Sequence, residues 1–346
     1  MKNKLIIAGP CSAETEKQVL KTAELLAATG KVNMLRAGIW KPRTRPGSFE
    51  GVGEIGLKWL IDAGKAVNLP VITEVANRDH VKLALDAGFK NFWIGARTTV
   101  NPFAVQEIAD SLEGKEIDLL LIKNPINPDL QLWIGAIERF QAAGIKNIGV
   151  IHRGFSAFKT NKYRNEPLWE IPLNLKQQFP DIKLICDPSH ICGRRDILEE
   201  VSQKAMDLEY DGLMIETHPK PDEAWSDAQQ QITPEVLNVM LEHIVMRQKT
   251  WENPETNEHL ELLRNQLQVL DHQVFEILGK RMEIAEKIGA LKKQNNITIL
   301  QSEKWKLVKE ERFQFGINKG LTEKFLTRYL DALHQESIRH QTKVMN

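Results

Sequence analysis

The sequence has few cysteines, no excess of charge of one sign and no long apolar run, and each shortage excludes a class of protein. Three cysteines in 346 residues are too few for a disulfide framework, so we expect a reducing, cytoplasmic compartment. Lys plus Arg and Asp plus Glu both number 46, which argues against a nucleic-acid partner. No apolar run approaches the ~20 residues that span a bilayer, so we expect no membrane partner. The apolar stretch after Lys4 is too short for a signal-peptide core and predicts a first strand instead.

Proline is missing from the last quarter of the chain. All 15 prolines lie at or before Pro254, and only four of the 21 glycines follow it, so that region is predicted to be long helices with few joints. The composition, 42% hydrophobic and 27% charged, is that of a globular protein. We therefore expect a large domain over residues 1–249, a polar linker over 250–257 and a helical domain over 258–346.

Short apolar runs alternate with longer amphipathic segments through the first 250 residues. Eight runs are spaced 22 to 37 residues apart, which favours a (β/α)₈ TIM barrel. The alternative is an open doubly wound sheet, which typically has a glycine-rich turn after its first strand, whereas Pro10-Cys11-Ser12 follows here. The predicted strands cover 5–9, 33–38, 70–75, 92–96, 118–123, 147–153, 183–188 and 211–217.

Basic residues stand at the predicted carboxyl ends of several strands, where barrel enzymes place their catalytic groups. Because like charges repel, a basic cluster at one mouth predicts anionic ligands, and Arg and Lys suit carboxylate and phosphate. We therefore expect small phosphorylated substrates. The basic residues at or just beyond the strand ends are Arg36, Lys41, Arg43, Arg97, Lys123 and Arg153.

A second set of strand-end residues has the chemistry of a metal site. Cys11, His190, Glu216 and Asp227 offer a thiolate, an imidazole and two carboxylates, a set that suits one divalent ion, Mn, Fe, Co or Zn. Cys192 competes weakly with Cys11 as a ligand, and Cys186 is predicted to lie in the core. His152 and His218 adjoin site residues and are as compatible with a structural role as with a direct one.

The motifs at these strand ends, taken in order, resemble 3-deoxy-D-arabino-heptulosonate 7-phosphate (DAHP) synthase over residues 5–230. Its sister, 3-deoxy-octulosonate 8-phosphate synthase, typically has Lys-Ala-Asn where this chain has Lys41-Pro42-Arg43-Thr44, so the resemblance implies erythrose 4-phosphate as acceptor, with the sister activity as the alternative. The matching segments are Gly9-Pro10-Cys11-Ser12, Arg36-Ala37-Gly38, Lys41-Pro42-Arg43-Thr44, Ile94-Gly95-Ala96-Arg97-Thr98-Thr99, Lys123-Asn124, Asp187-Pro188-Ser189-His190 and Ile215-Glu216-Thr217-His218-Pro219.

The resemblance also implies a role for each position. Cys11, His190, Glu216 and Asp227 would hold the divalent metal. Phosphoenolpyruvate would be bound by Arg36, Lys41, Arg97, Lys123 and Arg153. Arg43 and Thr44 would bind erythrose 4-phosphate, and Lys41 is the expected proton donor to the new alkoxide. Glu74 is expected either to orient a water or a lysine, or to form a structural ion pair.

The last ~90 residues are predicted to form three helices. Leu260, Leu263, Leu267, Leu270 and Val274 follow the 3-4-3-4 spacing of a helix that packs on another helix. Asn295-Asn296 is expected to end this helix, and the next two are expected at about 301–315 and 321–343. A plain dimerisation arm is one interpretation of this pattern.

Basic residues on the first helix indicate more than an arm. Arg281 and Lys292 lie about 20° apart around the helix, whereas Arg264 lies about 100° from Arg281 and would face a different partner. These residues resemble the all-helical chorismate mutase, an intertwined dimer with two shared sites, and Ser337 and Gln341 match its final helix. The resemblance covers 258–342 and implies that Arg281, Lys292 and Gln341 are catalytic, that Ser337 binds substrate, and that Arg264 reaches into the partner's site.

Three positions depart from that family's pattern. Gln301, Lys304 and Trp305 stand where it usually has Asp, Arg and Glu. An indole donates a hydrogen bond but cannot accept one, so recognition of the substrate hydroxyl must differ. The alternative to a working mutase is therefore a module that senses prephenate without turnover.

The sequence as a whole predicts a bifunctional enzyme of the shikimate pathway, at least a homodimer through its helical domain. Its expected small-molecule partners are phosphoenolpyruvate, erythrose 4-phosphate and chorismate. Prephenate or chorismate is expected to act as a feedback effector of the synthase, which requires different affinities for active and inactive states.

Overall fold

The structure is a computed structural model that describes residues 3–41, 47, 49–157, 162–248 and 254–346. The chain divides into two compact units, Met1–Arg247 and Gln248–Asn346. Within the described ranges, no helix is both long enough and apolar enough to cross a membrane.

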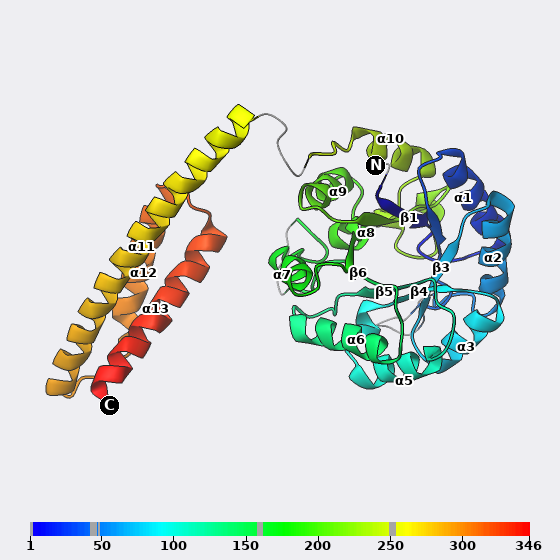
Figure 1. Ribbon diagram of the computed structural model, residues 1–346. Coiled ribbons are helices and arrows are strands. Elements are labelled where there is room, and N and C mark those ends of the chain that lie inside the picture. Colours follow the sequence, from blue (N-terminus) through cyan, green and yellow to red (C-terminus); the bar gives the residue numbers. More distant parts are fainter. Residues whose placement is uncertain (1–2, 42–46, 48, 158–161, 249–253) are drawn as a thin grey trace. The chain divides into compact units, whose positions relative to one another are not determined.

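The first unit is a closed barrel of parallel strands that pair in chain order, with the last strand against the first (Figure 1). This confirms the predicted TIM barrel and excludes the open sheet. One strand lies at each predicted run, and only β4 begins outside its run, one residue earlier. The strands are β1 (Leu5–Gly9), β2 (Met34–Arg36), β3 (Val71–Val75), β4 (Asn91–Ile94), β5 (Leu119–Lys123), β6 (Ile148–His152), β7 (Lys183–Cys186) and β8 (Gly212–Glu216).

Helices surround the barrel, as Figure 1 shows. Several begin at a side chain that accepts a hydrogen bond from the first turn, such as Thr15, Asn77 and Asn101. The helices are α1 (Glu16–Ala28), α2 (Ile55–Val67), α3 (Arg78–Asp86), α4 (Ala96–Thr99), α5 (Pro102–Leu112), α6 (Leu130–Ala142), α7 (Glu170–Gln178), α8 (Pro188–Cys192), α9 (Leu198–Asp207) and α10 (Pro234–His243). Two short 3₁₀ turns, η1 (Pro221–Glu223) and η2 (Ala228–Gln230), follow β8.

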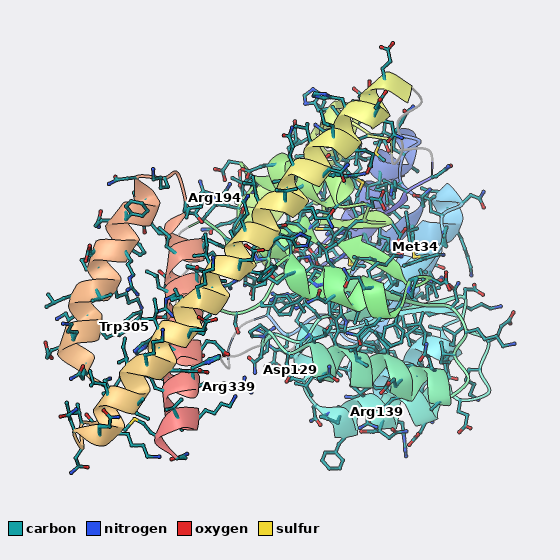
Figure 2. All side chains as sticks on the ribbon, turned by 60° about the vertical axis from the view of Figure 1, so that its left-hand side comes forward. Met34, Asp129, Arg139, Arg194, Trp305 and Arg339 are labelled. Atoms are coloured by element: carbon teal, nitrogen blue, oxygen red, sulfur yellow. The ribbon has the colours of Figure 1, made fainter. Side chains whose placement is uncertain are left out.

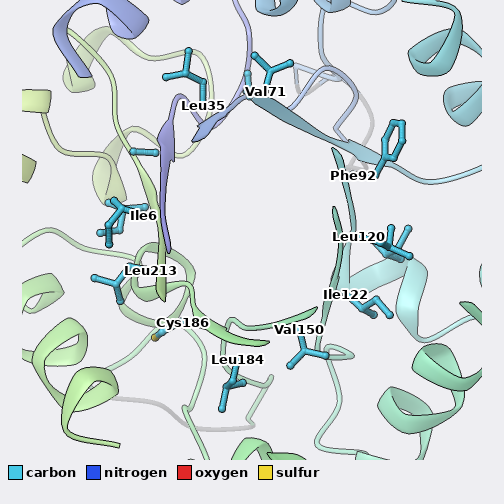
Figure 3. Packing of buried hydrophobic residues seen from close by; sticks show 14 of the residues in the cluster. Ile6, Leu35, Val71, Phe92, Leu120, Ile122, Val150, Leu184, Cys186 and Leu213 are labelled. Atoms are coloured by element: carbon cyan, nitrogen blue, oxygen red, sulfur yellow. The ribbon is translucent and has the colours of Figure 1, made fainter. Parts of the chain in front are cut away.

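The alternation of side chains along each strand divides the core in two. One set, including Leu35, Phe92 and Leu120, points outward and packs under the helices (Figure 3). The other set fills the barrel interior with Ile7, Met34, Ile72, Trp93, Leu119, Leu121, Ile151, Ile185 and Met214.

The same alternation positions the charged strand ends. Arg36 comes two residues after the interior Met34, Lys123 two after Leu121, and Glu216 two after Met214. Because the period of a strand is two, these charged side chains fall on the interior face, directly beyond the apolar filling. Glu74, Arg153 and Asp187 follow the same rule on β3, β6 and β7.

The second unit contains the three predicted helices, α11 (Pro254–Gln294), α12 (Ser302–Ile317) and α13 (Glu323–Met345). Met282, Ala285, Leu326 and Leu330 are buried between them. A Cβ at Gly289 would lie 3.0 Å from the Cα of Gln341, so glycine permits the close approach of α11 to α13. The first helix begins inside the segment predicted as linker, so the helical region starts earlier than residue 258.

The amino-terminal half of α11 is not covered by its own unit. Leu267 is 61% exposed, Leu270 56% and Phe275 70%, and in Figure 1 the first turns of α11 extend past α12 and α13. Leu267 and Leu270 belong to the apolar seam in the sequence. One copy of the chain thus leaves the seam without a partner.

Candidate functional site

Three of the four predicted metal ligands come together at the carboxyl end of the barrel. The donor atoms of Cys11, Glu216 and Asp227 all lie within 4.8 Å of one another. Cys11 Sγ is 3.3 Å from Asp227 Oδ2. The fourth, His190, borders this group with its Nε2 3.7 Å from Glu216 Oε1. The chain therefore gathers a thiol, two carboxylates and an adjacent imidazole from four separate segments.

The burial and hydrogen bonding of these donors fit a divalent cation. Glu216 is fully buried, and its Oε1 accepts no hydrogen bond although Arg36 Nη2 lies 3.0 Å away, so this oxygen has capacity left for a cation. Burial raises the pKa of the Cys11 thiol to about 12, so a cation would bind by displacing the thiol proton. The mixed sulfur, nitrogen and oxygen set suits Mn, Fe, Co or Zn.

A cavity of about 400 Å³ adjoins these donors. Its lining includes four of the predicted basic residues, Lys41, Arg97, Lys123 and Arg153. Lys123 and Arg153 are almost fully buried, and so many cations in one enclosed space favour an anionic ligand.

Arg36 is the most buried cation of the group, at 1% exposure. Its Nη2 lies 3.0 Å from Glu216 Oε1, and its guanidinium stands 4.8 Å from the centre of the Trp93 ring. Its Nε and Nη1 have no hydrogen-bond partner. Two unsatisfied donors on a buried guanidinium are costly unless a ligand accepts from them.

Lys41 connects the cavity to the metal donors. It follows β2 by five residues, lines the cavity, and its Nζ donates to Cys11 Sγ at 2.9 Å. Although burial opposes protonation, the neighbouring Cys11 sulfur and the Glu216 carboxylate raise the pKa of Lys41 above its usual value. The side chain is therefore an ammonium group within reach of both halves of the site.

Glu74 has a definite contact rather than the ion pair considered from the sequence. Its Oε2 accepts a hydrogen bond from Trp93 Nε1 at 2.7 Å, and it lines the cavity. A Cβ at Gly95 would lie only 2.2 Å from Glu74 Oε1, so a glycine is required beside this carboxylate. Glu74 thus fixes the indole on which Arg36 packs.

The sequence interpretation missed several residues of the site. Arg164 lines the cavity and donates to Asp227 Oδ1 at 3.0 Å and to Gln230 Oε1 at 2.7 Å. Asn165 accepts from Arg153 at 2.7 Å and donates to the carbonyl of His190. Both lie in the long segment between β6 and α7, and a second arginine after Arg153 was the only signal in the sequence.

Asp187 and Gln231 hold the predicted residues in place. Asp187 Oδ2 lies 2.9 Å from Lys123 Nζ and 2.8 Å from His190 Nδ1. Burial opposes its ionisation, but His190 and Lys123 hold the pKa of Asp187 well below its usual range. Gln231 Oε1 accepts from the backbone N–H of Cys11 at 3.0 Å.

The two histidines left open by the sequence have structural partners. His152 Nε2 bonds to the carbonyl of Pro167, and its Nδ1 accepts from the Tyr210 hydroxyl at 2.9 Å. Burial lowers the pKa of His152 to about 3, so it is neutral. His218 Nε2 lies 3.3 Å from the buried Glu14 carboxylate.

The other two cysteines pack in the core. Cys186 and Cys192 both belong to the apolar layer under the helices, and neither is disulfide-bonded. Arg43 and Thr44, the residues predicted to bind erythrose 4-phosphate, lie outside the described residues.

In the helical unit, α11 and α13 bring together four of the five predicted mutase residues. Arg281 donates to the buried Ser337 hydroxyl. Lys292 Nζ donates to Gln341 Oε1 at 3.1 Å and to the Ile299 carbonyl at 2.6 Å. Among the described residues these two cations contact only neutral groups, which leaves positive charge for an anionic substrate.

Arg264 stands apart from this group. It is exposed and ion-paired with Glu261 on the same helix. Seventeen residues along a helix separate it from Arg281 by about 25 Å. Of the three positions that depart from the family's pattern, Gln301 is exposed just before α12 and Lys304 is exposed on it. Trp305 stacks on His334.

Known proteins match both units. The profile of the DAHP synthetase I family matches residues 2–252, and that of chorismate mutase type II matches residues 263–342. A phospho-2-dehydro-3-deoxyheptonate aldolase of Thermotoga maritima is 31% identical over 240 residues, which cover 69% of this chain and 68% of that protein. A 2-dehydro-3-deoxyphosphooctonate aldolase of Francisella tularensis subsp. holarctica is 26% identical, with 64% and 83% covered.

The fold comparison agrees with the sequence matches. The crystal structure of the DAHP synthase from Thermotoga maritima aligns with a TM-score of 0.62 at 28% identity, covering 70% of this chain and 68% of that one. The predicted family resemblance is thus confirmed for the barrel and for the helical region. The chain belongs to the DAHP synthetase I family and carries a chorismate mutase type II domain after its barrel.

Proposed function

We propose that the barrel condenses phosphoenolpyruvate with erythrose 4-phosphate to DAHP and phosphate, with the help of a divalent metal ion. The observation that carries this proposal is the buried Arg36, whose two unpartnered nitrogens stand in a basic site beside the donors of Cys11, Glu216 and Asp227. This condensation requires a site that binds an anionic substrate next to a site that binds a metal cation.

The basic residues bind and orient phosphoenolpyruvate. Arg36, Lys41, Arg97, Lys123 and Arg153 neutralise its carboxylate and phosphate, and the stacked Trp93 and the Asp187–Lys123 pair keep these side chains in place. Its C3 carbon is thereby held toward the aldehyde carbon of erythrose 4-phosphate. Arg43 and Thr44 bind the acceptor. After the carbon–carbon bond forms, water adds at C2 and the phosphohemiketal releases phosphate.

Cys11, His190, Glu216 and Asp227 hold the metal, which when bound supplies Lewis-acid polarisation of the aldehyde oxygen. Lys41 donates a proton from Nζ to the alkoxide that develops on that oxygen. Its position against Cys11 Sγ places the ammonium group beside the metal ligands, within reach of an oxygen bound near them.

The acceptor specificity can be tested directly. The purified chain should consume phosphoenolpyruvate with erythrose 4-phosphate and give at least about tenfold lower kcat/KM with arabinose 5-phosphate, a difference of ~1.4 kcal/mol. Release of phosphate measures both reactions. A preference for arabinose 5-phosphate would instead make the barrel an octulosonate-forming synthase.

We also propose that the helical domain rearranges chorismate to prephenate. This reaction needs no covalent catalysis, only a reactive conformer and a stabilised developing charge. Arg281, Ser337 and the partner's Arg264 bind the carboxylates. Lys292 and Gln341, joined by their hydrogen bond, stand nearest the ether oxygen whose bond breaks.

The uncovered half of α11 supports a dimer. Leu263, Leu267, Leu270 and Val274 are each more than two-fifths exposed in one copy, and a second copy of the chain would bury them. In such a dimer Arg264, which lies far from Arg281 of its own chain, enters the partner's site. The enzyme is therefore a dimer through this domain.

Feedback follows from the fusion of the two activities. Prephenate bound at Arg281 and Lys292 lowers synthase activity by favouring an inactive arrangement of the domains. The alternative is a helical domain that senses prephenate without turnover, which the presence of Trp305 motivates.

Replacing Arg281 by alanine should affect both properties of the full-length chain. Chorismate turnover should fall by about 10²- to 10³-fold, because the cation that holds a carboxylate of the reactive conformer is lost. Inhibition of the synthase by prephenate should disappear as well. The exposed Arg339 of α13 is the matched control, and Arg339→Ala should change neither.

Two results would contradict these expectations. A wild-type chain that binds prephenate without converting chorismate is a sensor, not a mutase. An Arg281→Ala chain whose synthase is still inhibited by prephenate has its effector site elsewhere.

A further inference from the structure

Trp305 and His334 form the closest ring stack in the helical unit. Their centroids are 3.8 Å apart and their planes are inclined by only 5°. Trp305 comes from α12 and His334 from α13, and Figure 2 shows Trp305 between these helices. Trp305 stands where the family that the helical unit resembles usually has a glutamate. The stacked indole and imidazole therefore replace a carboxylate at this position.

His334 shares one face of α13 with two residues that contact α11. Ser337 and Gln341 follow it by three and seven residues, which places all three side chains within about 60° of one another around the helix. Ser337 accepts from Arg281, and Gln341 accepts from Lys292. His334 thus extends this row by one turn, toward the end where Trp305 lies.

The imidazole can provide what the indole cannot. Trp305 offers only an N–H donor, whereas a neutral histidine has one donor and one acceptor nitrogen. Burial lowers the pKa of His334, and Arg281 and Lys309 add to this effect against the charge of Asp331. The neutral form therefore prevails at neutral pH. The other two residues that depart from the family's pattern are poorer candidates for this acceptor. Lys304 has no acceptor atom, and Gln301 is exposed at the start of α12.

We propose that His334 replaces the missing carboxylate and accepts a hydrogen bond from the ring hydroxyl of chorismate and prephenate, while Trp305 fixes the imidazole plane by stacking. The inference rests on the proposed binding of these ligands at Arg281 and Lys292. A neutral acceptor makes a weaker hydrogen bond than a carboxylate, so the hydroxyl should contribute about tenfold to affinity rather than more.

Prephenate binding to the full-length chain, measured by calorimetry, tests the proposal without requiring turnover. His334→Phe keeps an aromatic ring against Trp305 and removes the acceptor, and it should weaken prephenate binding by about tenfold, or ~1.4 kcal/mol. His334→Asn keeps an acceptor and should stay within about threefold of the wild type. A prephenate analogue without the ring hydroxyl should bind wild type and His334→Phe equally.

Three other results would decide against the proposal. If His334→Phe binds prephenate as tightly as wild type does, His334 makes no contact with the hydroxyl. If it loses prephenate and the hydroxyl-free analogue equally, its role is structural. If the wild type binds prephenate without converting chorismate, the proposed mutase activity is wrong. The affinities of the His334 variants for prephenate then still test the role of His334. A wild-type chain that binds neither ligand would overturn both proposals.

Discussion

Replacement of Lys41 by methionine is expected to lower DAHP formation by about 10²- to 10⁴-fold, the range for loss of a positioned acid. Methionine keeps much of the length of lysine but has no ammonium group. The new alkoxide then has no proton donor at the junction of the cavity and the metal donors, where Lys41 Nζ meets Cys11 Sγ. Chorismate turnover should stay at the wild-type level, since Lys41 belongs to the barrel unit.

The metal site provides a readout that is independent of activity. The four expected ligands are Cys11, His190, Glu216 and Asp227. Lys41→Met removes none of them. Lys41→Met should therefore bind one equivalent of Co²⁺ and show the thiolate-to-cobalt charge-transfer band of the wild type, whereas Cys11→Ala should lack that band. Loss of the band in Lys41→Met would mean that lysine maintains the metal site rather than the proton transfer.

Lys58 provides the matched control for this experiment. It is 74% exposed on α2 and pairs only with Asp62 of the same helix, so Lys58→Met should leave kcat and KM within about twofold. If Lys41→Met retains more than a tenth of wild-type turnover with cobalt bound, another group donates the proton. Arg164 is too basic for that role.

The barrel could be predicted because one rule governs both its core and its site. A parallel strand buried on both faces gives a continuous apolar run, and a charged residue at the end of such a run is conspicuous. Arg36, Lys123 and Glu216 each stand two residues beyond an interior apolar side chain. The pattern that identifies the strands therefore also identifies the site residues.

Site residues in the middle of a long connection carry no such signal. Arg164 and Asn165 reach the cavity from the middle of a long connection, and their positions depend on contacts with Asp227 and Arg153 that are distant in the sequence. Trp305 is a similar case. Its sequence position shows that the glutamate is missing, but only the packing of α12 on α13 reveals His334 as its neighbour.

Mixed dimers should recover the mutase activity that each parent lacks. Arg264→Ala and Arg281→Ala are both expected to be nearly inactive as homodimers. If Arg264 serves the partner's site, one of the two sites in a mixed dimer has an intact Arg281 from one chain and an intact Arg264 from the other. Mixed dimers isolated through two different affinity tags should then regain about half of the wild-type activity.

The geometry of α11 makes this result decisive for the dimer. Arg264 lies about 25 Å along the helix from Arg281 and is paired only with Glu261, so the two cannot act on one small molecule within one chain. Arg281 and Lys292, by contrast, both contact α13 of their own chain. A mixed dimer of Arg281→Ala with Lys292→Ala should therefore stay inactive, because each site lacks one cation. No recovery with Arg264→Ala would show that Arg264 does not serve the partner's site. Recovery in the control would show that Arg281 and Lys292 of one chain serve different sites.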